Sequence, residues 1–103
     1  MDNTEFLKLS QQTLNYIVNI IEDRDIECLI DIDFDTETIH LMTKDGTFVI
    51  NQHSAAQEIW LASPISGPYR FLYTAGSWYS RNNTHLYQIL KEELNIEFSE
   101  YNI

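Results

Sequence analysis

The chain of 103 residues has room for one domain around a modest core, and we expect a single domain that spans residues 1–103. Sixteen acidic residues against six basic ones give a formal net charge of −10, which opposes binding to nucleic acid and to anionic membranes. No run approaches the ~20 apolar residues that a membrane span requires. We therefore expect cations or basic proteins as partners, and the N-terminal sequence, without a signal-like leader, predicts a cytoplasmic location.

The first element is predicted to be an amphipathic helix of about twenty residues. Asp2 and Glu5 stand where an N-cap and a first-turn acid are expected, and the helix should end near Glu22 and Asp23. Negative charge at the C-terminal end of a helix is disfavoured by the helix dipole, so these two acids suggest a functional use. The positions at helical spacing are Phe6, Leu9, Thr13, Tyr16, Ile17, Ile20 and Ile21.

Three aspartates, Asp31, Asp33 and Asp35, then alternate with apolar residues. Because a strand has a side-chain period of two, this alternation predicts a strand with one carboxylate face and one core face. We call these three residues the aspartate ladder. The only cysteine, Cys28, extends the apolar alternation backwards through Ile30 and is predicted to be a buried small hydrophobe. Whether the acidic face is merely solvated or collects cations stays open at this point.

Two tight hairpins should follow the aspartate ladder. A two-residue loop at Thr36-Glu37 pairs Ile32 with Leu41. The Asp45-Gly46 pair between two alternating runs is a strong hairpin signal, and a loop at this pair places Leu41 opposite Ile50. The three strands would then share one apolar face.

The aspartate ladder also resembles the start of an EF-hand loop. The sixth position of such a loop requires Gly and is Thr36 here, and the twelfth requires Glu and is Met42, so an EF-hand is excluded. Carboxylates without nearby Cys or His favour hard cations such as Mg²⁺, Ca²⁺ and ferric iron. The expected register places His40 opposite Asp33 on the outer face, either as a surface contact or as a ligand pair.

The remaining elements predict the fold class. A strand over residues 57–62 is followed by short strands over 69–73 and 77–79, and a helix over 86–94 should be capped by Asn83 or Thr84. The order of helix, antiparallel strands and helix predicts an α+β two-layer sandwich. Its two terminal helices would pack on one face of the sheet and leave the other face in water.

Trp60 is a candidate interaction residue. The alternation along its strand points Ile59 and Leu61 to the core and Trp60 to the solvent-exposed face of the sheet. A large exposed aromatic with polar surroundings is typical of an interaction anchor. The alternative is that Trp60 only covers surface neighbours such as Met42 or Val49. The usual signatures of nucleotide, hydrolase or thiol chemistry are not found in the sequence.

Three segments resemble the core signature of the frataxin family, whose small bacterial members are called CyaY. They are Val49-Ile50-Asn51-Gln52, Gln57-Glu58-Ile59-Trp60-Leu61-Ala62-Ser63-Pro64 and Ser66-Gly67-Pro68-Tyr69-Arg70-Phe71. The resemblance covers nearly the whole chain, from the acidic first helix to the Leu-rich last one. It implies the frataxin fold and a role in iron–sulfur cluster assembly.

The resemblance also implies specific site residues. Weakly bound iron, ferrous or ferric, and other divalent cations would lie on an acidic ridge formed by Glu22, Asp23, Asp25, Glu27, Asp31 and Asp33. The sequence departs from the family's acidic pattern at Val18, Asn19 and Leu29, so we expect a thinner ridge. The ridge would dock on a basic patch of cysteine desulfurase. Trp60 would dock on the iron–sulfur scaffold protein, with Asn51, Gln52 and Gln57 as its polar neighbours.

Three functions remain to be separated. The leading hypothesis is an iron-binding regulator or iron chaperone of iron–sulfur cluster assembly, without catalysis of its own. The second is ferroxidase or iron-storage activity, which oxygen consumption on addition of ferrous iron would detect. The third is an acidic docking module whose metal binding is incidental.

Overall fold

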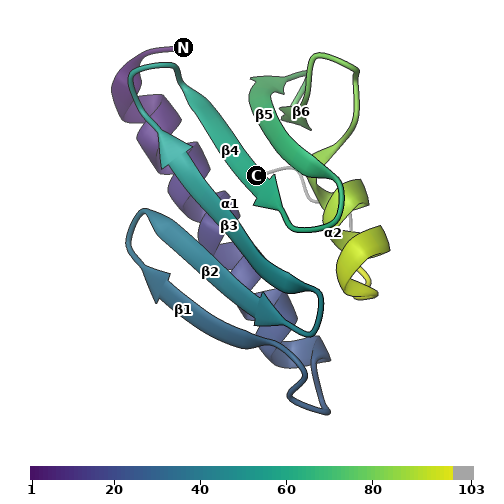
Figure 1. The fold of residues 1–103 in the computed structure, drawn as a ribbon. Coiled ribbons are helices and arrows are strands. Elements are labelled where there is room, and N and C mark those ends of the chain that lie inside the picture. The colour runs from purple at the N-terminus through teal and green to yellow at the C-terminus, as the bar shows by residue number, and fades with distance from the viewer. Residues whose placement is uncertain (99–103) are drawn as a thin grey trace.

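The computed structural model describes residues 1–98 and arranges them as a helix, six strands and a second helix (Figure 1). The elements are α1 (Asn3–Arg24), β1 (Asp31–Asp35), β2 (Thr38–Thr43), β3 (Gly46–His53), β4 (Glu58–Ser63), β5 (Gly67–Thr74), β6 (Ser77–Tyr79) and α2 (Leu86–Leu94). The strands form one antiparallel sheet in sequence order, with both helices on one face. This confirms the α+β two-layer prediction. Within residues 1–98, neither helix is long and apolar enough to cross a membrane.

Helix α1 begins as the sequence predicts. The Asp2 carboxylate accepts a hydrogen bond from the Glu5 amide at 2.8 Å, which satisfies one of the free N–H groups of the first turn. The helix ends at Arg24, slightly beyond the predicted end. Its buried face carries Phe6, Ser10, Thr13, Leu14, Ile17, Val18 and Ile21, which pack on the sheet.

The first hairpin has the predicted register, with Ile32 opposite Leu41 and Asp33 opposite His40. The second hairpin differs from the prediction, because Leu41 pairs with Phe48 and not with Ile50. The turn closes over residues 44 and 45, and the residue after them, Gly46, already pairs within the sheet. The shift of two residues leaves every side chain on its predicted face, because the strand period is also two.

The position of this turn follows from its surroundings. The Thr43 hydroxyl accepts from the Asp45 amide at 3.1 Å and donates to the Gly46 carbonyl at 2.9 Å, which closes the loop one residue earlier than predicted. Gly46 has a φ of 121°, and a Cβ added there would lie 2.8 Å from the Pro64 Cβ. Glycine therefore serves here as a strand residue in close contact with the β4–β5 loop.

The prediction of a buried Cys28 is wrong, because β1 begins only at Asp31 and Cys28 is exposed with a φ of 54°. The Asp25 carboxylate accepts from the Leu29 amide at 3.0 Å and from the Ile30 amide at 2.8 Å. These side-chain bonds take the N–H groups that a longer strand would have used. Residues 25–30 therefore form a loop, in which Ile30 still packs against the core whereas Cys28 does not.

The later elements follow the prediction except at the last helix. β4 begins and ends one residue later than expected, and the turn at Ala75-Gly76 separates β5 from β6. The N-cap of α2 is His85 and neither Asn83 nor Thr84. Its ring Nδ1 accepts from the Tyr87 amide at 3.0 Å, and its backbone has the extended conformation of a cap, whereas Asn83 is left-handed.

Trp78, on the edge strand β6, joins the two layers. Its side chain is buried, and its indole Nε1 donates to the Thr13 hydroxyl of α1 at 2.8 Å. The ring meets Phe6 edge-on at 6.0 Å and Tyr73 at 5.1 Å between ring centroids. Nearby in the helix layer, burial raises the pKa of the Tyr87 hydroxyl, which keeps this group neutral.

Candidate functional site

The aspartate ladder lies on the outer face of the sheet, as predicted, at the β1 edge. Asp31, Asp33 and Asp35 are exposed, whereas the two residues between them are partly buried. Carboxylates two residues apart on one strand lie ~7 Å apart, and in water-like surroundings each neighbouring pair repels by about 0.6 kcal/mol. Ion pairs within residues 1–98 join Arg24 to Asp23 and Lys91 to Glu97, so none of them neutralises the ladder.

The helix half of the predicted acidic ridge lies around the end of α1, close to the beginning of β1 (Figure 1). Glu22, Asp23 and Glu27 are exposed. Asp25 is half-buried, and its two carboxylate oxygens are already engaged by backbone amides. Within residues 1–98, no three His, Cys, Asp or Glu side chains gather closely enough to hold a metal ion. The predicted ridge is therefore a dispersed acidic surface, and its metal binding stays a prediction.

Trp60 is half-buried on the outer face and is held from three sides. The His53 ring stacks on the indole with 3.7 Å between centroids and 12° between planes, and the Arg70 guanidinium carbon lies 4.6 Å from the ring centroid. The indole Nε1 donates to the Glu58 carboxylate at 2.8 Å. These neighbours differ from Met42 and Val49, which the alternative interpretation gave as the cover of Trp60. A ring fixed in this way loses little conformational freedom when it docks.

The sequence analysis missed His53, Glu58 and Arg70 as parts of this site. Arg70 pairs directly with Trp60 across β4 and β5, and His53 pairs with Glu58 across β3 and β4. Alternation alone puts them on the outer face, but only the register of these hairpins places them beside Trp60. The His53 Nδ1 atom is buried without a hydrogen-bond partner among the described residues.

The three predicted polar neighbours of Trp60 differ in their positions. Asn51 lies directly opposite Trp60 in the sheet, as expected. Gln52 points the other way, because its side chain is hydrogen-bonded to the Ser10 hydroxyl of α1 at 2.7 Å. Its predicted position beside Trp60 is therefore wrong, since neighbouring residues of a strand face opposite sides. Gln57 lies in the β3–β4 turn with a φ of 54°.

The aspartate ladder and Trp60 belong to one continuous face. One row of cross-strand partners runs from Asp35 through Thr38 and Asn51 to Trp60 and Arg70. Three strand spacings of ~4.8 Å separate the first strand of this row from the Trp60 strand, or about 14 Å. A single protein surface could therefore contact both.

A family model described as "Frataxin-like domain" matches residues 1–100 of this sequence. The chain belongs to the frataxin family. It is 37% identical to the mitochondrial frataxin of Arabidopsis thaliana over 101 residues, which cover 91% of this chain and 54% of that protein. The chain thus spans about half the length of this curated relative.

Solved frataxins share the fold. A frataxin from Psychromonas ingrahamii superposes with a TM-score of 0.85 over 97% of this chain and all of that chain, at 21% identity, which speaks for the fold alone. Trimeric frataxin from Saccharomyces cerevisiae, complexed with ferrous iron, has a TM-score of 0.68 at 32% identity and covers 92% of this chain and 84% of that one. The family predicted from the sequence is confirmed.

In this frataxin-family chain, divalent cations should raise the melting temperature at low ionic strength. Cations bound near the aspartate ladder would relieve the repulsion between its carboxylates and would bind the folded chain better than the unfolded one. At tenfold excess over the dissociation constant the gain is ~1.4 kcal/mol, which corresponds to roughly 5–10 °C for a domain of this size. Thermal unfolding with and without millimolar Mg²⁺ or Ca²⁺ measures the shift. An Asp31→Asn, Asp33→Asn variant should lose most of it, and equal shifts in both proteins would contradict the prediction.

Proposed function

We propose that this chain is an iron-binding regulator of iron–sulfur cluster assembly, which holds iron weakly at its acidic ridge and docks on cysteine desulfurase and on the iron–sulfur scaffold. The observation that carries the proposal is the outer sheet face, which presents the aspartate ladder on β1 and the fixed Trp60 ring on β4, three strand spacings apart. Membership of the frataxin family and the ferrous complex of the yeast relative support the iron component.

The two parts of this face suit different tasks. Exposed carboxylates attract basic surfaces and cations over distances of about a Debye length. They therefore steer the approach of a basic partner and raise the local concentration of iron. An aromatic ring held by His53, Glu58 and Arg70 offers a preorganised apolar contact, which is typical of an interface hot spot. We infer that the ladder raises the association rate and that Trp60 lowers the dissociation rate of the complex.

A reconstituted cluster-assembly assay tests the proposal. Cluster formation on the scaffold is followed by absorbance, with cysteine desulfurase, cysteine and ferrous iron, in the presence and absence of this chain. A regulator changes the initial rate in proportion to the complex formed. An unchanged rate at saturating concentrations of the chain would refute the proposal.

Replacing Trp60 by alanine should weaken docking on the scaffold by about 2 kcal/mol or more, which is roughly 30-fold in the dissociation constant. The fold should tolerate the change, because the ring lies on the outer face and is only half-buried. Isothermal titration calorimetry measures the affinity. Ile65→Ala, which removes an exposed apolar side chain from the β4–β5 loop, is the matched control. Equal affinities of the two variants would remove Trp60 from the interface.

Salt and iron titrations separate the regulator from the acidic docking module. Both functions predict that docking on the desulfurase weakens with salt, because the contact is electrostatic. Only the regulator predicts that ferrous iron changes the affinity or the rate of cluster formation. Ferroxidase activity stays a prediction from the family resemblance.

A further inference from the structure

Residues 25–30 hold two large apolar side chains out of the core. Ile26 is 87% exposed and Leu29 is 68% exposed, more than any other large apolar residue that the structure describes. The turn that presents them is well bonded, because the Asp25 carboxylate holds the amides of Leu29 and Ile30, and the Asp25 carbonyl accepts from the Cys28 amide at 3.0 Å. The exposure of Ile26 and Leu29 is thus fixed by a hydrogen-bonded loop.

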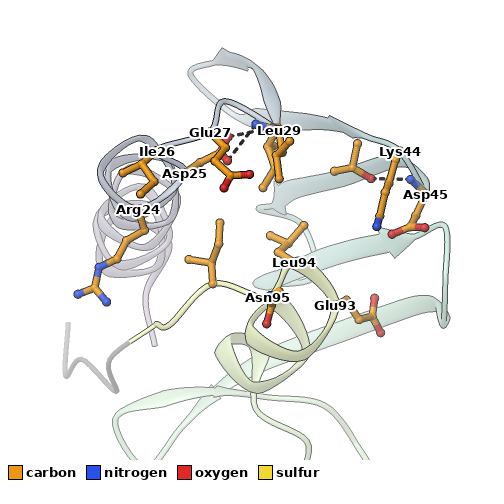
Figure 2. A pocket seen from close by; sticks show the side chains of 13 residues that line it. Arg24, Asp25, Ile26, Glu27, Leu29, Lys44, Asp45, Glu93, Leu94 and Asn95 are labelled. Carbon is orange, nitrogen blue, oxygen red and sulfur yellow. Dashed lines mark hydrogen bonds between the residues drawn. The ribbon is translucent and has the colours of Figure 1, made fainter.

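Leu29 lies on the wall of a groove of about 600 Å³ between the two helices and the sheet. The groove is bounded by the end of α1, the 25–30 turn, the β2–β3 turn and the end of α2 (Figure 2). Figure 2 shows Leu29 on one side of the opening and Leu94 on the other. Ile30 and Ile96 also line it, so part of the lining is apolar. A space of this size accepts one or two large side chains.

The rim of the groove is acidic. Its charged lining residues are the four acids Asp25, Glu27, Asp45 and Glu93 and the two bases Arg24 and Lys44, an excess of two negative charges. Arg24 points away from the opening in Figure 2 and approaches the Asp23 carboxylate at 3.7 Å. The exposed acids of the ridge, including Glu22 and Asp23, continue the negative charge along α1.

We propose that this groove receives a large apolar side chain from a basic protein segment, whose Lys or Arg residues face the acidic rim. The proposal rests on the proposed function and deepens it, because it adds an apolar anchor to an acidic ridge that otherwise attracts only charge. The net charge of −10 favours a basic occupant. It opposes the binding of nucleic acid, of an anionic membrane and of a second copy of this chain.

A pair of synthetic peptides tests the apolar anchor. Both carry the same Lys and Arg residues; one has two central leucines and the other has two serines in their place. Fluorescence anisotropy at low and at moderate salt gives the two affinities for the full chain. The leucine peptide should bind about tenfold tighter than the serine peptide. Salt should weaken both peptides alike and leave this ratio unchanged, because burial of apolar surface is not screened.

Variants locate the anchor. Leu29→Gln should reduce the advantage of the leucine peptide to about twofold, because a polar side chain then lines the groove. Leu7→Gln is the matched control and should keep the full advantage, since Leu7 is an exposed leucine near the other end of α1. Neither substitution alters the net charge. Amide chemical-shift changes from the leucine peptide should centre on residues 25–30 and the end of α2.

Any of four results would overturn the proposal. Equal binding of both peptides leaves electrostatic docking at the ridge intact and removes only the groove. Equal losses in Leu29→Gln and Leu7→Gln, or shift changes centred on the outer sheet face, place the anchor elsewhere. Failure of both peptides to bind also refutes the groove, whereas the cluster-assembly assay, which uses no peptide, decides the proposed function separately.

Discussion

Replacing Trp78 by alanine should lower the free energy of unfolding by about 3–5 kcal/mol, a large part of the 5–15 kcal/mol that stabilises a typical domain. The substitution leaves a cavity in the core beside β6, where the indole packs against Phe6 and Tyr73. It also removes the hydrogen bond to the Thr13 hydroxyl that joins β6 to α1. Urea denaturation followed by circular dichroism measures the change.

Two further variants separate the contribution of ring packing from that of the hydrogen bond. Trp78→Phe keeps most of the ring volume and loses the hydrogen bond, so it should cost clearly less than alanine. Thr13→Val keeps the volume of residue 13 but leaves the buried indole N–H without its acceptor, which costs about 1–3 kcal/mol. A loss below about 1 kcal/mol in Trp78→Ala would mean that the core closes over the cavity and that Trp78 does not organise it.

Reversing the charge of the aspartate ladder should nearly abolish the proposed docking on cysteine desulfurase at low salt. The Asp31→Lys, Asp33→Lys double variant changes the charge of the outer face by four units, and each unit opposite a basic partner contributes on the order of 1 kcal/mol. The expected loss of affinity is therefore at least 100-fold, and the effect of the chain on the rate of cluster synthesis should disappear with it. Surface plasmon resonance at several salt concentrations measures the affinity.

A matched control separates the effect of the ladder's position from the effect of total net charge. Glu92→Lys with Glu97→Lys makes the same change in total charge with two exposed acids of α2 and the segment after it. α2 lies on the opposite side of the sheet from the ladder (Figure 1), so this variant should keep most of the affinity. If both double variants lose affinity equally, the docking depends on total charge and the ladder has no special role.

Much of this site could be predicted from the alternation of residues. The exposed aspartate ladder, the half-buried Trp60 and the helix-covered opposite face all follow from a side-chain period of two. The error in the second hairpin did not affect these assignments, because a slip of two residues preserves the face. The family resemblance placed Gln52 beside Trp60, although its alternation with Phe48 and Ile50 puts it on the inner face, where the structure has it.

The turn before β1 marks where local patterns stop being informative. Cys28 and Ile30 continue the apolar alternation of β1, yet the Asp25 carboxylate captures the amides of residues 29 and 30 and ends the strand pattern. Side-chain bonds to nearby backbone compete with strand pairing, and their outcome depends on where α1 ends. The exposure of Leu29 and the groove beside it therefore could not be read from the sequence.

The sequence by itself determined the order of elements, the two faces of the sheet and the family, because these depend on the periodicity and on residues close together in the chain. Only the tertiary structure decided which side chains surround Trp60, since His53, Trp60 and Arg70 come from three strands whose register is set by their turns. It also decided that Asp35, the last residue of the aspartate ladder, lies in the same cross-strand row as Trp60. Proximity across strands is a property of packing, and no local pattern in the chain specifies it.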